Sequence, residues 1–316
     1  MLEVKDLKTE LSTQRGIIRA VDGVNLRINE SERVALVGES GCGKTMTALS
    51  IIRLVPDPPG KITSGEIQFK GINLLERTNH EMTELRGKEI SMVFQDPMTF
   101  LNPLMKIGDQ IAEGVRIHQK IGKNQALERA VETLRSVSIP APDKVCSYYP
   151  HQLSGGMRQR VLIAIALACD PVFVILDEPT TALDVTTQSQ ILRLTSDLTK
   201  KLSLLLITHD LGIVGYLADV VYVMYVGKIV EHGDVFSIYE EPAHPYTQGL
   251  LNSVLSIDEF KKTLETIGGM VPDALNPPGG CRFHPRCTRV LDICRSKEPP
   301  EVQVGQDHFV SCWLYK

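Results

Sequence analysis

The sequence lacks long apolar segments and an excess of charge of either sign. Its longest apolar runs, such as VLIAIALAC, are about half the length that a bilayer-spanning helix needs, so we expect no membrane span. The net charge of -4 excludes the strongly basic balance that is typical of many nucleic-acid-binding proteins. The first residues, MLEVKDLKTEL, carry charges throughout and no apolar core, so we expect no secretory signal. These absences indicate a soluble cytoplasmic protein whose cysteines stay reduced.

The chain is long enough, at 316 residues with 43% hydrophobic, for one large domain or two ordinary ones. Two continuous apolar runs, VFVILD and LSLLLIT, predict strands that are buried on both faces, as in a parallel sheet. Residues 98–149 have a helical pattern, and ADVVYVMYVGKIVEHG predicts a hairpin that turns at Gly227-Lys228. Eight of the 18 prolines lie beyond Gly233, where regular periodicity fades, so we place a domain boundary there.

A glycine-rich segment, GESGCGKT, follows the strand-like run RVALVG and precedes a helical pattern. It fits G-x-x-x-x-G-K-T, in which backbone N–H groups and a helix N-terminus surround the phosphates of a nucleotide. Lys44 would then reach the β- and γ-phosphates, and Thr45 would ligate Mg²⁺. A glycine turn before an ordinary helix is the alternative, which the long match in this context disfavours. The ATP-binding residues predicted here are Gly38, Ser40, Gly41, Gly43, Lys44, Thr45 and Met46.

An acidic pair ends one of the two apolar runs. Asp177 and Glu178 follow VFVIL, at the carboxyl end of a predicted buried strand, where open α/β sheets bind their ligands. Asp177 suits the coordination shell of Mg²⁺, and Glu178 suits the polarisation of an attacking water molecule. Capping of the following helix is the alternative role for such a pair.

The segment LSGGMRQR directly precedes the helical run VLIAIALA. Ser154, Gly155 and Gly156 therefore lie at a predicted helix N-terminus, which suits an anion or a simple cap. In combination, these motifs resemble those of the ATP-binding cassette (ABC) ATPases. LSGGMRQR resembles the signature of that family, GESGCGKT its Walker A motif and VILDEP its Walker B motif.

Three further residues extend the resemblance. Gln95 in VFQDP resembles the Q-loop glutamine, Asp184 in TALD the D-loop aspartate, and His209 in LLITHD the switch histidine. All six motifs occur in the order that the family has. By this resemblance, Gln95 would contact Mg²⁺, Asp184 would bind ATP, and Gln95 and His209 would act in catalysis with Glu178.

The resemblance also implies a fold and an assembly. The fold is α/β, a P-loop NTPase cassette with a RecA-like mixed or parallel sheet core, an N-terminal antiparallel β part and a helical subdomain at about 96–160. The cassette would span 1–232, and 233–316 would form a small, irregular, metal-binding extension. Two cassettes would meet head to tail, with ATP held between the Walker A motif of one and Ser154, Gly155 and Gly156 of the other.

One position departs from the family's pattern. Cassettes usually stack adenine on an aromatic residue before the second strand, but KTELSTQRGIIRAV contains none. Arg15 or Ile17 could cover the base instead, by guanidinium stacking or apolar contact. Both remain candidates for the adenine contact.

Other segments resemble a narrower group, the importers of dipeptides, oligopeptides and nickel. These segments are FQDPMTFLNPLMKIGDQIAE, EEPAHPYTQGLLNSV and PPGGCRFHPRC. The resemblance implies an ATPase that energises peptide import, bound peripherally to the cytoplasmic face of a prokaryotic membrane. Its partners would be two transmembrane permease subunits, a second and different ABC ATPase and, indirectly, an extracytoplasmic solute-binding protein. Import of nickel or another solute, and a soluble regulatory ABC ATPase, are the alternatives.

Four of the seven cysteines lie near the end of the chain, at Cys281, Cys287, Cys294 and Cys312. Zinc ribbons use closer C-x₂₋₄-C pairs, but four thiolates can hold either Zn²⁺ or an iron–sulfur cluster. Buried thiols without a ligand are a third possibility. Some peptide-importer cassettes with this cysteine pattern hold a 4Fe–4S cluster, so the resemblance favours a cluster, with Zn²⁺ as the alternative.

Overall fold

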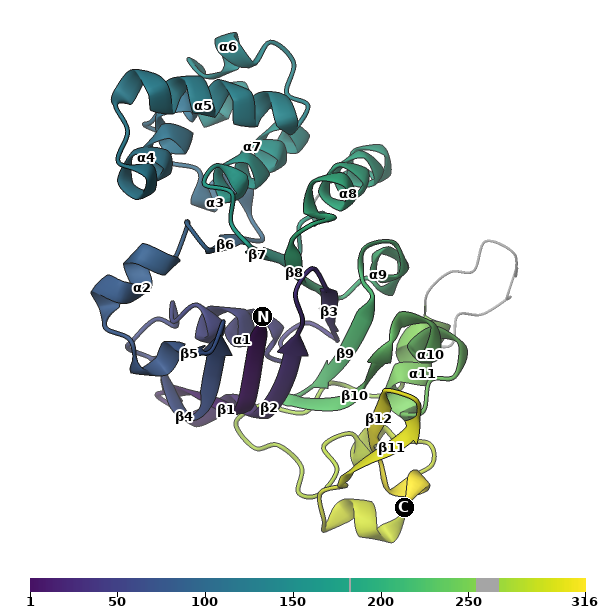
Figure 1. Ribbon diagram of the computed structural model, residues 1–316. Helices are drawn as coiled ribbons and strands as arrows, with labels where there is room; N and C mark the ends of the chain where they lie inside the picture. The colour runs from purple at the N-terminus through teal and green to yellow at the C-terminus, as the bar shows by residue number, and fades with distance from the viewer. Residues whose placement is uncertain (182, 254–266) are drawn as a thin grey trace. The chain divides into compact units, whose positions relative to one another are not determined.

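The computed structural model describes residues 1–181, 183–253 and 267–316 of the chain (Figure 1). They fall into two compact units, the first made of 1–76 and 207–316 and the second of 77–206. The first unit therefore contains both ends of the chain, and Gly233 lies inside it. Whether the chain beyond Gly233 is a separate domain stays a prediction.

The N-terminal part of the first unit is an antiparallel sheet with the strand order β2-β1-β4-β5. In it, Leu2 pairs with Ile28 on one side and with Phe69 on the other, and all three side chains are buried. Apolar residues at matched register positions thus hold one face of the sheet against the core. The strands are β1 (Leu2–Thr13), β2 (Gly16–Ile28), β4 (Gly60–Phe69) and β5 (Ile72–Asn73). The predicted N-terminal antiparallel part is confirmed.

A second set of strands in the first unit supports the glycine-rich loop. Strand β3 (Arg33–Val37) pairs in parallel with β9 (Val220–Tyr225), which forms a hairpin with β10 (Lys228–Asp234). The hairpin is confirmed, but its turn lies at Val226-Gly227, one residue before the predicted position. Both turn residues have positive φ, 41° and 81°, as the type I′ turn of a two-residue hairpin loop requires. The helices of this unit are α1 (Lys44–Ile51), α9 (Leu211–Leu217), α10 (Val235–Glu240) and α11 (Pro245–Asn252).

The C-terminal segment is less irregular than the sequence suggested. Strands β11 (Glu301–Gly305) and β12 (His308–Ser311) form a hairpin, and β12 pairs with β10 (yellow in Figure 1). The chain end thus extends the sheet that contains β9 and β3. The expectation of an irregular extension is wrong for these residues, because two short alternating runs after the last prolines form strands.

A buried carboxylate ties this chain end to β10. Glu231 has a fully buried side chain whose Oε1 lies 2.8 Å from Nε2 of His308 on β12. Its two oxygens also accept hydrogen bonds from the backbone N–H groups of Ala243 and His244, at 2.6 and 2.9 Å. Three donors from two distant segments therefore converge on one acid, which compensates the loss of its hydration.

The second unit joins two parallel strands to a group of helices. Strand β6 (Ile90–Val93) pairs in parallel with β7 (Phe173–Asp177). Strand β8 (Ser203–Thr208) follows and crosses from this unit into the first. Both apolar runs predicted as strands are strands, and β7 and β8 are buried along their whole lengths, as expected.

The segment predicted to be helical is confirmed. Helices α4, α5 and α7 pack against one another. In α4, Ile107, Ile111 and Val115 recur every fourth residue and are buried, so one face of the helix meets its neighbours. The helices of the unit are α2 (Asn79–Leu85), α3 (Pro97–Phe100), α4 (Ile107–Gln119), α5 (Lys123–Ser136), α6 (Pro142–Val145), α7 (Gly155–Leu167) and α8 (Val185–Thr199). Among the described residues, no helix has the length and apolar character to cross a bilayer.

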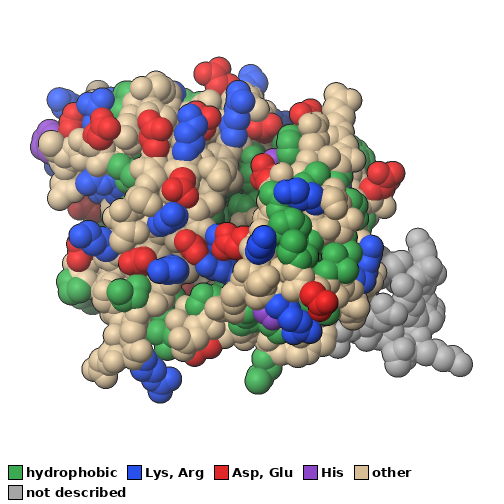
Figure 2. All heavy atoms as spheres, turned by 90° about the horizontal axis from the view of Figure 1, so that it is seen from below, with side chains coloured by type: hydrophobic (Ala, Val, Ile, Leu, Met, Phe, Trp, Pro, Cys, Tyr) green, Lys and Arg blue, Asp and Glu red, His purple; other side chains and the backbone are tan. Residues whose placement is uncertain are grey.

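Acidic and basic side chains are interspersed over the face that Figure 2 shows. On the described residues visible there, neither sign forms an extended region. This mixing agrees with the small net charge of -4.

Candidate functional site

The glycine-rich loop runs from the end of β3 to the start of α1, as predicted. Gly38 has φ 152°, and a Cβ there would lie 2.2 Å from the carbonyl oxygen of Met224. Gly43 has φ 110°, and a Cβ there would lie 2.2 Å from the carbonyl oxygen of Ala20. Any side chain at either position would overlap backbone atoms, so only glycine lets the loop approach β9 and β2 this closely.

Lys44 is buried at the start of α1, and its ammonium group bends back over the loop. Its Nζ donates to the carbonyl oxygens of Gly38 and Glu39, at 2.7 and 3.0 Å. Ser40, Gly41 and Thr45 are exposed, and nothing lies within 4 Å of the place where a Cβ of Gly41 would stand. The loop therefore combines a lysine ammonium group, held by hydrogen bonds, with an outer side that solvent can reach, as a phosphate-binding loop needs.

In the second unit, the structure brings Gln95 and Glu178 together. Gln95 lies just beyond β6 and Glu178 just beyond β7, and because these neighbouring strands are parallel, both residues lie at the same edge of the sheet. Nε2 of Gln95 donates to Oε2 of Glu178 at 2.7 Å. The hydroxyl of Thr181 donates to the same oxygen at 3.0 Å. Thr181 was not among the residues predicted from the sequence, because a threonine after the acidic pair carries no distinctive pattern.

The backbone of Glu178 adopts a left-handed conformation with φ 46°. Non-glycine residues seldom do so, and such strain persists where the surroundings fix it. Asp177, the last residue of β7, is almost completely buried at 2% exposure. The carboxylate of Asp177 is thus buried at the edge of the sheet, and that of Glu178 accepts hydrogen bonds from two side chains.

Ser154 is the N-cap of α7, where its Oγ accepts a hydrogen bond from the N–H of Met157 at 3.4 Å. Asp184 is likewise the N-cap of α8, with bonds of 2.9 and 2.7 Å from the N–H and hydroxyl of Thr187. The N–H of Thr187 lowers the pKa of Asp184 below its ordinary value, so the cap is ionised.

The two helix starts are also in contact. A Cβ on Gly156 would lie 2.5 Å from Cγ2 of Thr187, so glycine is required for the close approach of α7 to α8. Ser154 and Gly155 remain exposed. The predicted signature segment and Asp184 therefore form one packed group within the second unit, and its outer side is accessible.

The remaining predicted residues lie in the first unit, where His209, Arg15 and Ile17 are exposed and Met46 is half-buried. His209 follows β8 directly, and Met46 lies in the first turn of α1. Arg15 and Ile17 lie at the turn between β1 and β2, and Ile17 is 56% exposed. Their roles towards a nucleotide stay predictions.

The four C-terminal cysteines gather in one part of the first unit. Burial raises the pKa of the Cys281 thiol to about 11, and the other three cysteines add to this shift. The N–H of Cys281 donates to the carbonyl oxygen of Cys294 at 2.8 Å, and buried Cys312 packs with Ala243 and Val310. Yet within 1–181, 183–253 and 267–316, no group of three or more His, Cys, Asp or Glu residues is arranged to hold a metal ion.

The predicted metal-binding character of the extension is therefore not supported. Burial raises the pKa of the Cys281, Cys287 and Cys312 thiols, and neighbouring cysteines of the group raise it further. Apolar packing accounts for the position of Cys312.

Two family models match the chain. One, described as ABC transporter, matches residues 21–181, and the other, described as the C-terminal region of oligopeptide/dipeptide transporters, matches 230–294. The oligopeptide transport ATP-binding protein OppD of Bacillus subtilis (strain 168) is 50% identical over 99% of this chain and 88% of its own length. The dipeptide transport ATP-binding protein DppD of the same organism is 46% identical over 99% of this chain and 94% of its own.

Solved structures agree with this relationship. A dimeric ATP-binding cassette in a post-hydrolysis state, bound to ADP and Pi, has a TM-score of 0.67 at 28% identity and covers 74% of this chain and 99% of its own. The protein cbiO1 from Clostridium perfringens, part of an ABC transporter complex, has a TM-score of 0.64 at 28% identity and covers 76% and 90%. On its sequence motifs, its fold and these relatives, the chain belongs to the ABC transporter family and is one of its ATPases.

Proposed function

We propose that the chain is the ATP-hydrolysing subunit that energises peptide import through partner membrane proteins. The observation that carries hydrolysis is the bond from Gln95 to Glu178, which orients a carboxylate beside the buried Asp177. The relatives named for oligopeptide and dipeptide transport support the substrate class. The match of residues 230–294 to the C-terminal region of such transporters supports it independently of the ATPase motifs.

Each motif has a defined part in the proposed reaction. Lys44 and the backbone N–H groups of 38–45 bind the β- and γ-phosphates, because phosphoryl transfer depends mainly on positioning and charge stabilisation. Glu178 polarises the water that attacks the γ-phosphorus, and Gln95 and Thr181 fix the orientation of its carboxylate. His209 contacts the γ-phosphate, and Arg15 or Ile17 contacts adenine.

The side-chain oxygens of Thr45, Asp177 and Gln95 suit Mg²⁺, which prefers oxygen ligands. When bound, Mg²⁺ would neutralise charge on the phosphates. In the proposed dimer, Ser154, Gly155, Gly156 and Asp184 act on the nucleotide of the facing cassette. Exposure of Ser154 and Gly155 at the start of α7 supports this role, because an open helix N-terminus favours anions.

The proposed partners are two transmembrane permease subunits and a second, different ABC ATPase, with an extracytoplasmic solute-binding protein acting through the permease. The chain would lie peripherally on the cytoplasmic face of a prokaryotic membrane. No role with nucleic acid is proposed.

This function can be tested by reconstituting the chain with its candidate membrane subunits in lipid vesicles. We expect the chain to co-purify with them and its ATPase rate to rise severalfold when a peptide-loaded binding protein is added. The same vesicles with unloaded binding protein are the control. Stimulation by nickel instead of peptide would show that the imported solute is nickel. Failure of the chain to associate with the membrane subunits would favour a soluble regulatory ATPase.

A 4Fe–4S cluster, or Zn²⁺, at Cys281, Cys287, Cys294 and Cys312 stays a prediction from the family resemblance. Its support is that the four thiols affect one another electrostatically. Anaerobically purified protein should then be brown and contain stoichiometric iron, and Cys294→Ser should remove both colour and iron. Colourless protein with stoichiometric zinc would identify a zinc site, and protein without either metal would leave packing as the role of these residues.

A further inference from the structure

An arginine of the C-terminal segment reaches the glycine-rich loop. Arg286 ends a short 3-10 turn (His284–Arg286), and its side chain is only 4% exposed. Its Nη1 and Nη2 donate to Oε2 and Oε1 of Glu39, at 2.6 and 3.0 Å. This is the bidentate arrangement in which an arginine–carboxylate pair is strongest and most directional. The bond to Glu39 raises the pKa of Arg286 above its ordinary value.

Glu39 is the second residue of the glycine-rich loop, and three of its groups are held by hydrogen bonds. Its side chain binds Arg286, its N–H donates to the hydroxyl of Tyr246 at 2.8 Å, and its carbonyl oxygen accepts from Lys44. Two of these three attachments come from residues beyond position 240. The beginning of the loop is therefore held by the chain end and by the loop's own lysine.

The groups that hold Glu39 are themselves firmly placed. Tyr246 is fully buried in the first turn of α11, where Nδ1 of His244 accepts its N–H at 3.0 Å. Burial lowers the pKa of His244 to about 3, so the ring is neutral and can accept that bond. The guanidinium of Arg286 lies 5.9 Å from the ring centroids of both Tyr225 and Phe283.

A second arginine supports the loop from its other side. Arg282 is buried and donates to the carboxylate of Asp22 and to the carbonyl oxygen of Val226 in the β9–β10 turn. The next residue of that turn, Gly227, donates its N–H to the carbonyl oxygen of Cys42 at 2.7 Å. Arg282 thus reaches the middle of the loop through the turn, while Arg286 reaches its beginning directly.

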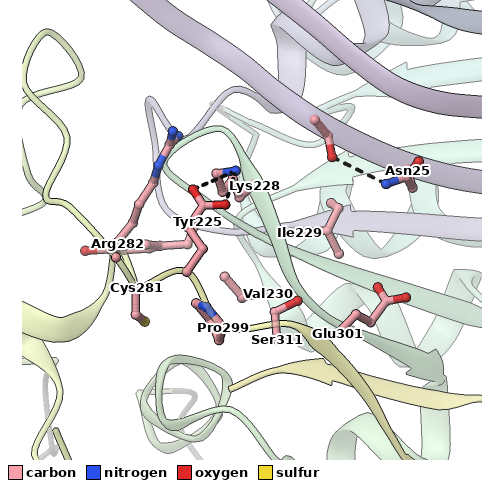
Figure 3. Close-up of a pocket in the computed structure, with 13 residues that line it drawn as sticks. Asn25, Tyr225, Lys228, Ile229, Val230, Cys281, Arg282, Pro299, Glu301 and Ser311 are labelled. Carbon is pink, nitrogen blue, oxygen red and sulfur yellow. Dashed lines mark hydrogen bonds and ion pairs between the residues drawn. The ribbon is translucent and has the colours of Figure 1, made fainter. Parts of the chain in front are cut away.

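Packing between the C-terminal segment and the hairpin is incomplete beside these contacts. A cavity of about 210 Å³ lies there, with Lys228 and Ile229 on the hairpin side and Cys281 and Pro299 on the other (Figure 3). Arg282 lines this cavity, so its hydrogen bonds to Asp22 and Val226 are made at the junction where the packing is incomplete.

We propose that Arg286 is a positioning residue for ATP, through which the C-terminal segment fixes the phosphate loop. The inference rests on the proposed function of residues 38–45. Two physical effects act in the same direction. The bidentate bond orders the loop before ATP arrives, so less ordering remains to be done on binding. The guanidinium also neutralises a carboxylate that would otherwise repel the phosphates of the nucleotide.

The test uses the full-length ATPase in its reconstituted complex. Arg286→Gln should raise the KM for ATP about 10-fold, the effect expected from loss of a charge-assisted hydrogen bond, with kcat within about 2-fold. Arg286→Lys should have an intermediate KM, because it retains the charge without the bidentate geometry. The double variant Arg286→Gln/Glu39→Gln should recover part of the affinity, since the repelling carboxylate is then absent. Arg295→Gln, an exposed arginine of the same segment, is the matched control.

A second measurement separates this inference from the proposed function. Hydrogen exchange of the backbone amides in 38–45 should be faster in nucleotide-free Arg286→Gln than in the unmodified chain and in Arg295→Gln. If the unmodified chain bound no ATP, the proposed function would fail while this exchange difference would still test the attachment. Unchanged KM and unchanged exchange in a folded Arg286→Gln protein would overturn the inference.

Discussion

Replacing Glu178 with glutamine should abolish ATP turnover and leave ATP binding intact. The hydrogen bonds from Gln95 and Thr181 both reach Oε2 of this side chain, an acceptor that the carbonyl oxygen of a glutamine can replace. Glu178→Gln can therefore retain these two hydrogen bonds while it removes the charge that polarises water. We expect the hydrolysis rate to fall at least about 100-fold, the lower end of what a positioned general base contributes.

The measurement is single-turnover hydrolysis together with equilibrium binding of a fluorescent ATP analogue. Lys44→Ala is the contrasting variant, because it removes a cation that we assign to the phosphates, and it should weaken binding itself. Thr181→Val should have a smaller effect on rate than Glu178→Gln, since Gln95 still orients the carboxylate. Hydrolysis by Glu178→Gln at the unmodified rate would show that another group acts on the water.

Replacing Glu231 with glutamine should destabilise the first unit by about 1–3 kcal/mol, the cost of leaving a buried hydrogen-bonding group unsatisfied. Oε1 faces two donors, from Ala243 and His308, and Oε2 faces the N–H of His244. Whichever way the amide is oriented, its NH₂ group meets a donor. At least one buried hydrogen bond is lost, and a repulsive contact replaces it.

Tryptophan fluorescence is a convenient measurement for this prediction. Trp313 is the only tryptophan of the chain, and its Nε1 donates to the carbonyl oxygen of Lys297 at 3.0 Å within the C-terminal segment. Its fluorescence during urea unfolding should show a lower midpoint for Glu231→Gln. Glu298→Gln is the matched control, because Glu298 is 58% exposed in its pair with Lys228 and should change the free energy of unfolding by less than about 1 kcal/mol. Equal midpoints for the two variants would contradict the assigned role of Glu231.

Features with a local signal were predictable from the sequence. The two apolar runs became β7 and β8, and the helical pattern of 98–149 became α3 to α6. Ser154 could be placed as an N-cap because a serine followed by glycines and a helical run is a short-range pattern. The glycines of the loop were likewise identifiable, because their spacing reflects direct steric limits at Gly38 and Gly43.

Features that depend on distant partners were not predictable. Glu39 and Arg286 are separated by 247 positions, and Glu231 and His308 by 77. Neither pair produces a recognisable pattern in the sequence. Strands β11 and β12 are only five and four residues long and follow a proline-rich stretch, so their alternation was too short to recognise. The cysteine spacing favoured a cluster only through resemblance, since spacing alone does not determine how thiols are arranged in space.

The division of the chain between the two units has a consequence for its synthesis on the ribosome. The second unit, 77–206, is continuous and can fold as soon as it has emerged. The first unit must wait, because β3 (Arg33–Val37) pairs with β9 (Val220–Tyr225), which is translated roughly 10 to 40 s later at ordinary elongation rates. During that interval β3, which leads into the phosphate loop, lacks its neighbour β9 on one side. A nascent chain stalled before residue 220 would therefore expose the edge of β3 that pairs with β9, and we expect such intermediates to be the forms that chaperones and proteases recognise.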